Sequence, residues 1–273
     1  MGKYFKDNNK QIIGYYSWSN KSAKNAAEFT NSQQFNCIKS LVNECDTIFI
    51  TTPDGVIENV WNEIKELSIK DKVICHCSGS LSSKIFSNIE YYGAYGYSIH
   101  PMFAISDKYN SHKDLKKAFI TIEGSQEKLA QLKKFIESLG NKTRIITAEN
   151  KAKYHAASVI VSNHVIALID EGVHVLKDCG FNEEEALEAL YPLIINNIKN
   201  VQERGIVNSL TGPIERGDVE TINNHLQCFK EADRELYRLL SRKLLAIAKK
   251  KNQGRNYEEI EYTIGEKKWK IQV

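Results

Sequence analysis

The first half of the chain alternates short apolar runs with segments of helical periodicity. "DTIFITTP" and "KVICHCSG" are nearly continuous apolar runs, which is typical of strands that are covered on both faces of a sheet. Between them, apolar residues recur with a period of 3.6 at Val56, Ile57, Val60, Trp61, Ile64 and Leu67, which predicts a helix.

The same alternation extends over about 147 residues. Further strands are predicted in "QIIGYYS", "AYGYSIHPM", "AFITIEG" and "KTRIITA", and further helices over 22–29, 80–89 and 125–140. Strands that alternate with helices form parallel sheets with right-handed crossovers. The sequence therefore predicts an α/β fold with a doubly wound, mostly parallel, Rossmann-like sheet.

The pattern changes near residue 148. No strand is predicted from there to about residue 251; we expect one long helix over 148–180, followed by helices over 182–205, 218–229 and 232–250. The tail "YEEIEYTIGEKKWKIQV" alternates around "GEKK", which predicts a β-hairpin. The predicted domains are thus a dinucleotide-binding domain over 1–147, a helical substrate or dimerisation domain over 148–252, and a hairpin extension over 253–273.

Composition adds few constraints. A hydrophobic content of 42% and a charged content of 26% are ordinary for a globular protein, and a net charge of +3 gives no reason to expect a nucleic-acid partner. No apolar run of the roughly 18 residues of a membrane span and no signal peptide are visible.

Six scattered cysteines indicate free thiols in a reducing compartment, so we expect a cytoplasmic protein without a membrane partner. "CHC" at 75–77 lacks a second ligand pair, which favours core packing and no metal.

Polar residues follow the first predicted strand. In dinucleotide-binding folds an acid at this position bonds the ribose of NAD. Here Ser17, Ser19 and Lys21 occur without an acid, and hydroxyls with a lysine suit the 2′-phosphate of NADP. The alternative is that Ser19 or Asn20 only caps the next helix.

The next two strands also end in polar loops. Thr51, Thr52 and Pro53 follow one strand, and Ser78 with Gly79 follows the other. Ligands of such sheets bind at the carboxyl ends of the strands, so we expect Thr51, Thr52, Pro53 and Ser78 to contact a cofactor. Gly79 permits a close backbone approach, either to a ligand or to a neighbouring part of the chain. Asp54 is expected to cap the helix that it begins.

Two histidines are candidates for proton transfer, because histidine changes charge near neutral pH. His100 ends a strand, where its alternative role is a partly buried histidine bonded to the backbone. His155 shares a helical stripe with Ser158 and Ser162, and Asn163 follows. Polar side chains on an otherwise apolar helix need partners, which indicates a site.

The segment "LTGPIERGD" is rich in residues that shape loops. Arg216 could clamp a carboxylate or phosphate, and Asp218 is placed to cap the following helix. The alternative is a structural ion pair between these two residues.

Together, "YHAASVIVSN", "LYPLI", "LTGPIERGD", "IHP" and "TTPD" carry a resemblance. From Met1 to about Leu240 the chain resembles Rossmann-like NADP-binding oxidoreductases with a C-terminal domain of unknown function 2520. These are similar in layout to pyrroline-5-carboxylate reductase and prephenate dehydrogenase. The family begins with a strand and a glycine loop, whereas this chain begins within the next helix, so the resemblance implies a truncated N-terminus. It also implies a homodimer formed through the helical domain.

The resemblance and the residues together predict an NADP-dependent oxidoreductase. It would transfer a hydride to or from a small anionic carbonyl or imine substrate. His155 is expected to transfer the proton, and His100 is the second choice for this role. Ser158 and Asn163 are expected to belong to the same catalytic site. Substrate contacts are expected from Ser162, Thr211, Arg216 and Asp218. The alternatives are a non-catalytic nucleotide or metabolite binding protein and an inactive truncated fragment.

Overall fold

The chain forms two compact units in the computed structural model, which describes residues 1–265. The first unit is Met1–Ala167 and the second begins at Leu168. The division falls within helix α7 (Asn163–Asp178), about twenty residues beyond the boundary expected from the sequence. The helix that carries His155 therefore belongs to the same unit as the sheet.

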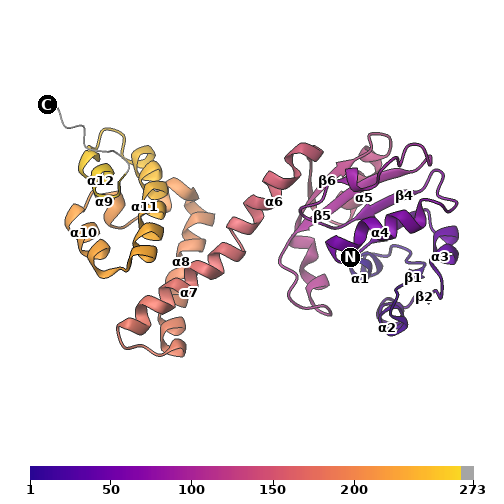
Figure 1. Ribbon diagram of the computed structural model, residues 1–273, viewed down its shortest axis with the longest axis horizontal. Coiled ribbons are helices and arrows are strands. Elements are labelled where there is room, and N and C mark those ends of the chain that lie inside the picture. The colour runs from indigo at the N-terminus through magenta and orange to yellow at the C-terminus, as the bar shows by residue number, and fades with distance from the viewer. Residues whose placement is uncertain (266–273) are drawn as a thin grey trace. The chain divides into compact units, whose positions relative to one another are not determined.

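A five-stranded sheet organises the first unit (Figure 1). In spatial order the strands are β3 (Thr47–Ile50), β4 (Val73–His76), β5 (Tyr95–Met102), β6 (Phe119–Gly124) and β7 (Lys142–Ile145). All neighbours are parallel except the antiparallel pair of β5 and β6. The predicted mostly parallel α/β fold is confirmed.

The predicted first strand is much shorter than expected. Only β1 (Gly14–Tyr15) forms, and it pairs in parallel with β2 (Gln33–Gln34) as a separate two-stranded sheet. Helix α2 (Asn20–Thr30) connects the two strands. The first helix, α1 (Gly2–Asp7), buries Tyr4 and Phe5 in the same core cluster as β5 and β6.

Helices α3 (Ile38–Glu44), α4 (Asp54–Ile64) and α5 (Leu129–Ser138) also belong to this unit. The helix predicted over 80–89 is wrong, because only a 3-10 turn, η1 (Ser83–Ile85), forms there. The carboxylate of Glu123 accepts hydrogen bonds from the Ser83 backbone N–H at 2.8 Å and from its hydroxyl at 2.6 Å. These bonds hold the chain against the sheet in a non-helical path. A second 3-10 segment, η2, covers Ser111–Lys117.

The long helix predicted over 148–180 is interrupted. It consists of the 3-10 turn η3 (Ala148–Asn150), α6 (Lys151–Ile160) and α7, with a break at 161–162. The Ser162 hydroxyl donates to the Ser158 carbonyl at 2.8 Å, and such bonds from a serine to its own helix bend helices. The next helix, α8 (Glu183–Ser209), begins with the capping box of Asn182 and Glu185 and is interrupted at Gly205, whose φ is 75°.

Four helices build the core of the second unit: α9 (Pro213–Arg216), α10 (Val219–Cys228), α11 (Glu231–Lys251) and α12 (Glu258–Thr263). Helix α12 contradicts the first part of the hairpin predicted over 253–273. Tyr257, Ile260 and Ile264 are buried at helical spacing, although the same stretch also alternates in polarity. The rest of that prediction lies outside the described residues.

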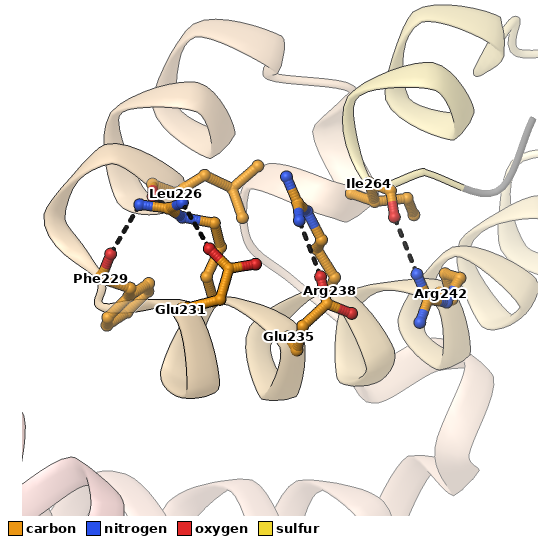
Figure 2. Close-up of polar contacts among 8 residues, drawn as sticks. Leu226, Phe229, Glu231, Glu235, Arg238, Arg242 and Ile264 are labelled. Atoms are coloured by element: carbon orange, nitrogen blue, oxygen red, sulfur yellow. Dashed lines mark hydrogen bonds and ion pairs between the residues drawn. The ribbon is translucent and has the colours of Figure 1, made fainter. Parts of the chain in front are cut away.

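Arginines of α11 tie neighbouring elements together (Figure 2). Arg234 donates to the carbonyls of Leu226 and Phe229, each at 2.8 Å, and so satisfies acceptors at the end of α10. Arg242 donates to the Ile264 carbonyl at 3.0 Å, just beyond α12. Carbonyls at helix ends need such partners because the helix itself leaves them unpaired.

The outer surface of α7 and α8 is strongly apolar. By length and composition alone, the helical segment Ala148–Asp178 could cross a membrane, and few of its residues are buried. On α8, exposed apolar residues recur at helical spacing in an α8 stripe formed by Leu187, Tyr191, Ile195 and Ile198. Exposed apolar surface of this extent indicates an interaction site.

Candidate functional site

Loops at the carboxyl ends of β3 and β4 are joined by one carboxylate. The Asp54 carboxylate accepts hydrogen bonds from the hydroxyls of Ser78 at 2.7 Å and Ser80 at 3.0 Å. The start of α4 has no side-chain capping bond, so the capping role predicted for Asp54 is wrong. Its side chain instead fixes the loop that contains Gly79.

The two predicted histidines come together over that loop, although 55 positions separate them in the sequence. The ring centroids of His100 and His155 are 6.5 Å apart. A Cβ atom on Gly79 would lie 2.6 Å from Cδ2 of His155 and 2.9 Å from Nε2 of His100. The absent side chain therefore allows both imidazoles to pack directly against the backbone of Gly79. His100 is not bonded to the backbone alone, because its Nδ1 lies 2.7 Å from the Tyr154 hydroxyl.

Two residues that the sequence analysis did not select lie beneath these histidines. Lys151 is 1% exposed, and its Nζ donates to the Ser98 hydroxyl at 2.5 Å. Ser98 is fully buried and donates in turn to the Ser78 carbonyl at 3.3 Å. A signal existed in their spacing, because Ser98 precedes His100 by two residues on a strand and Lys151 precedes His155 by one helical turn.

Burial dominates the electrostatics of this region. It lowers the pKa of His100 to about 4, and the nearby charge of Lys151 acts in the same direction. Burial also lowers the pKa of His76 to about 4 and that of Lys151 to about 8. The pKa of the Tyr154 hydroxyl is raised, again chiefly by burial. At pH 7 the site therefore combines a neutral His100 with a protonated Lys151.

The residues predicted to hold a cofactor differ in their exposure and in their hydrogen bonds. Ser17 accepts from the Ser19 backbone N–H, and Ser19 accepts from that of Ser22, each at 3.3 Å. The capping alternative for Ser19 is therefore observed, while Lys21 is exposed at the start of α2. Thr51 and Pro53 are exposed, and Thr52 carries a buried hydroxyl without a partner among residues 1–265.

An unpartnered buried hydroxyl costs free energy unless a ligand or water bonds it. The free hydroxyl of Thr52 at the end of β3 is therefore compatible with a polar group such as the carboxamide of a nicotinamide. We therefore take the loops after β3 and β4 as fitting the predicted cofactor.

The remaining predicted residues make local contacts. The hydroxyls of Ser158 and Ser162 donate to carbonyls of their own helix, and Ser162 also donates to the Asn163 side chain. In the second unit, Asp218 accepts from the Thr221 N–H at 3.1 Å and thus caps α10. Arg216 is 59% exposed on its side chain and lies 3.8 Å from Asp218, which is the structural pair considered as the alternative.

Thr211 is exposed in the turn before α9. Within the described part of the chain, no group of three or more histidine, cysteine, aspartate or glutamate side chains is arranged to hold a metal ion. The six cysteines are free.

Comparisons with known proteins agree with this fold. Residues 118–244 match the family described as Domain of unknown function (DUF2520). A search of the curated proteins finds no significant match. Among solved structures, the chain is similar to protein TM1727 from Thermotoga maritima, with 29% identity and a TM-score of 0.71 over 86% of this chain and 89% of that one.

Two further structures share the fold at lower identity. A protein from Bacteroides fragilis, BF3122, provisionally described as an NADP oxidoreductase, is 22% identical with a TM-score of 0.70, covering 90% of this chain and 92% of its own. An imine reductase from Myxococcus stipitatus, solved in complex with NADP+, is 11% identical with a TM-score of 0.60, covering 91% and 88%. At such identities the likeness shows the fold alone.

The buried histidines should make the first unit sensitive to acid. His76 and His100 titrate near 4 when folded and near 6.5 when unfolded, so the unfolded chain binds more protons between these values. The free energy of unfolding should therefore fall as the pH falls through this window. Urea unfolding at pH 7 and pH 5, followed by the fluorescence of buried Trp61, measures the difference. His76→Asn should reduce this difference in the free energy of unfolding. Equal stability of the wild type at pH 7 and pH 5 would contradict this account.

A methyl group on Gly79 should disturb the site. Gly79→Ala would collide with both imidazoles, and overpacking of this kind typically costs about 1–3 kcal/mol of stability. Gly55→Ala is the matched control, since a Cβ there meets nothing within 4 Å and alanine favours helix α4 by up to about 1 kcal/mol. Urea unfolding of both variants tests this; equal stability of the two would contradict the tight approach at Gly79.

Proposed function

Because residues 118–244 carry a DUF2520 domain and the fold is that of NADP-binding reductases, we propose that the protein is an NADP-dependent oxidoreductase. Its substrate would be a small anionic compound with a carbonyl or imine group. Six free cysteines fit a reducing compartment, so we propose that it acts in the cytoplasm.

One observation carries this proposal: two imidazoles pack against Gly79, at the carboxyl end of β4, the end of such a sheet where ligands bind. Reduction of a C=O or C=N bond needs a proton at the oxygen or nitrogen, and histidine is the side chain most often used for proton transfer near neutral pH. A substrate bound beside these two rings would have a proton donor within reach.

The chain's residues then have separate tasks. Bound NADPH would supply the hydride, and the loops carrying Thr52 and Ser78 would hold its nicotinamide. His155 would deliver the proton to the substrate, and Asp54 would keep the Gly79 loop in position through Ser78.

Replacement of His155 should separate chemistry from cofactor binding. In His155→Asn, turnover should fall by about 10²-fold or more, because general acid–base catalysis contributes about 10²–10⁴-fold, while NADPH should raise the melting temperature as in the wild type. The control is His164→Asn, at an exposed histidine of α7. Turnover is measured as NADPH oxidation with a panel of small keto acids and cyclic imines.

The outcomes of that experiment distinguish the alternatives. Full activity in His155→Asn would remove the histidine from the mechanism. Tight binding of NADPH without turnover on any substrate would favour a non-catalytic binding protein. The absence of any thermal shift with NADPH would contradict the proposed cofactor.

We also propose that a second copy of the chain covers the α8 stripe. The adjoining segment Ala148–Asp178 is interrupted at 161–162 and carries charged residues such as Lys153, Asp170 and Glu171. Charged side chains are costly within a bilayer but are common at the rim of a protein interface. A homodimer is therefore a better account of this surface than a membrane.

Ile198→Glu should shift the chain towards monomers, because it places a charge within the α8 stripe. Asn196→Glu adds the same charge at an exposed position on another face of α8 and should leave the oligomer intact. Light scattering after size-exclusion chromatography measures both masses. A monomeric wild type would contradict the proposal, and its co-sedimentation with lipid vesicles would favour a membrane instead.

A further inference from the structure

Lys151 is an expensive residue to bury. It is the first residue of α6 and is 1% exposed. Its ammonium group bonds Ser98, but among residues 1–265 no carboxylate lies within ion-pair distance of it. Burial of a charge without an ion-pair partner is unfavourable, so the position is not explained by stability.

Lys151 takes part in a paired contact between a helix and a strand. Lys151 and Tyr154 are three residues apart on α6 and share one face of the helix. Ser98 and His100 are two residues apart on β5 and share one face of the strand. The two hydrogen bonds, of 2.5 Å from Lys151 to Ser98 and 2.7 Å between Tyr154 and His100, join these faces. We refer to these four residues as the α6–β5 clamp.

The clamp contributes to the charge state of His100. Burial is the main cause of its lowered pKa, and the positive charge of Lys151 is the next. His155 on α6 and His76 on β4 act in the same direction, whereas Asp54 on α4 opposes them. Between about pH 4 and pH 8, His100 is thus neutral while Lys151 is charged.

The clamp also links the tautomer of His100 to the direction of its hydrogen bond with Tyr154. The raised pKa of Tyr154 keeps its hydroxyl protonated at neutral pH. When this hydroxyl donates to Nδ1, the single imidazole proton lies on Nε2. Nε2 lies next to Gly79, at the carboxyl end of β4, where the substrate is proposed to bind.

We infer that His100 is a neutral hydrogen-bond donor to the reacting oxygen or nitrogen, and that Lys151 is a positioning residue that, together with burial, keeps it neutral. This inference rests on the proposed reductase function, and it leaves the proton transfer itself to His155. A neutral histidine polarises a carbonyl by hydrogen bonding without giving up its proton, and lowered basicity suits it to that task.

Nuclear magnetic resonance titration tests the charge state without cofactor or substrate. The imidazole signals of His100 are identified by their loss in His100→Asn and are followed from pH 8 to pH 4.5 in the full chain. The wild type should stay neutral over this range with its proton on Nε2. A wild-type midpoint near the ordinary histidine value, or a proton on Nδ1, would overturn the inference, and this measurement needs no folded variant.

Two variants separate the charge of Lys151 from its hydrogen bond. Lys151→Met removes the charge and should move the His100 midpoint upwards, without lowering the melting temperature. Ser98→Ala keeps the charge while removing the bond, and should move the midpoint less. Equal midpoints in the wild type and Lys151→Met would show that Lys151 does not hold His100 neutral.

Kinetic and binding measurements decide the catalytic role separately. In His100→Ala, kcat should fall by about 10²-fold, the typical loss of one preorganised donor, while the NADPH-induced thermal shift is retained. Unchanged kcat would overturn the role of His100. If the wild type binds no NADPH, the proposed function fails together with that role, whereas the titration independently decides the role of Lys151.

Discussion

The seating of α6 on β5 is the interaction on which the candidate site depends. The α6–β5 clamp fixes both the height of the helix along the strand and its rotation. A shift of one helical turn, about 5.4 Å, would leave the Lys151 ammonium and the His100 ring without their present partners. Because His155 follows Tyr154 directly, its distance from His100 is set by the same two hydrogen bonds.

The α6–β5 clamp lowers the stability of the fold but favours the neutral form of His100. A lysine buried without a carboxylate costs free energy, and its lowered pKa reports that cost. Proteins retain such features at functional sites and offset them elsewhere. Here the apolar cores beside the sheet offset the free-energy cost of burying Lys151. Their fully buried residues include Trp61, Ile74, Tyr97 and Ile120.

Much of the sheet could be predicted because its strands are continuous apolar runs. β3, β4, β5 and β6 all formed where such runs occur. The position of His100 near the Gly79 loop also followed from the rule that strand ends meet at one edge, whereas the approach of His155 on α6 did not. The hairpin prediction was wrong where one pattern fits two structures. The stretch around Ile260 alternates in polarity, as a strand does, yet its burial follows helical spacing.

The unpredicted part of the site has a different physical cause. Lysine is almost always a surface residue, so Lys151 gave no sign of burial in the sequence. Asp54 at the first position of a helix is typical of a cap, and only the fold brings Ser78 and Ser80 within its reach. Such roles depend on contacts between residues distant in the chain, which local patterns do not record.

Fold and chemistry are therefore supported by different observations. An 11% identity to an imine reductase preserves the arrangement of strands and helices, which does not by itself specify a reaction. The chemistry depends on a few side chains. With Lys151 charged and His100 neutral, the ring can donate a hydrogen bond but is a poor source of protons. Two adjacent histidines can then act differently, one polarising the substrate and the other protonating it, because the first is buried and has a buried ammonium group beside it.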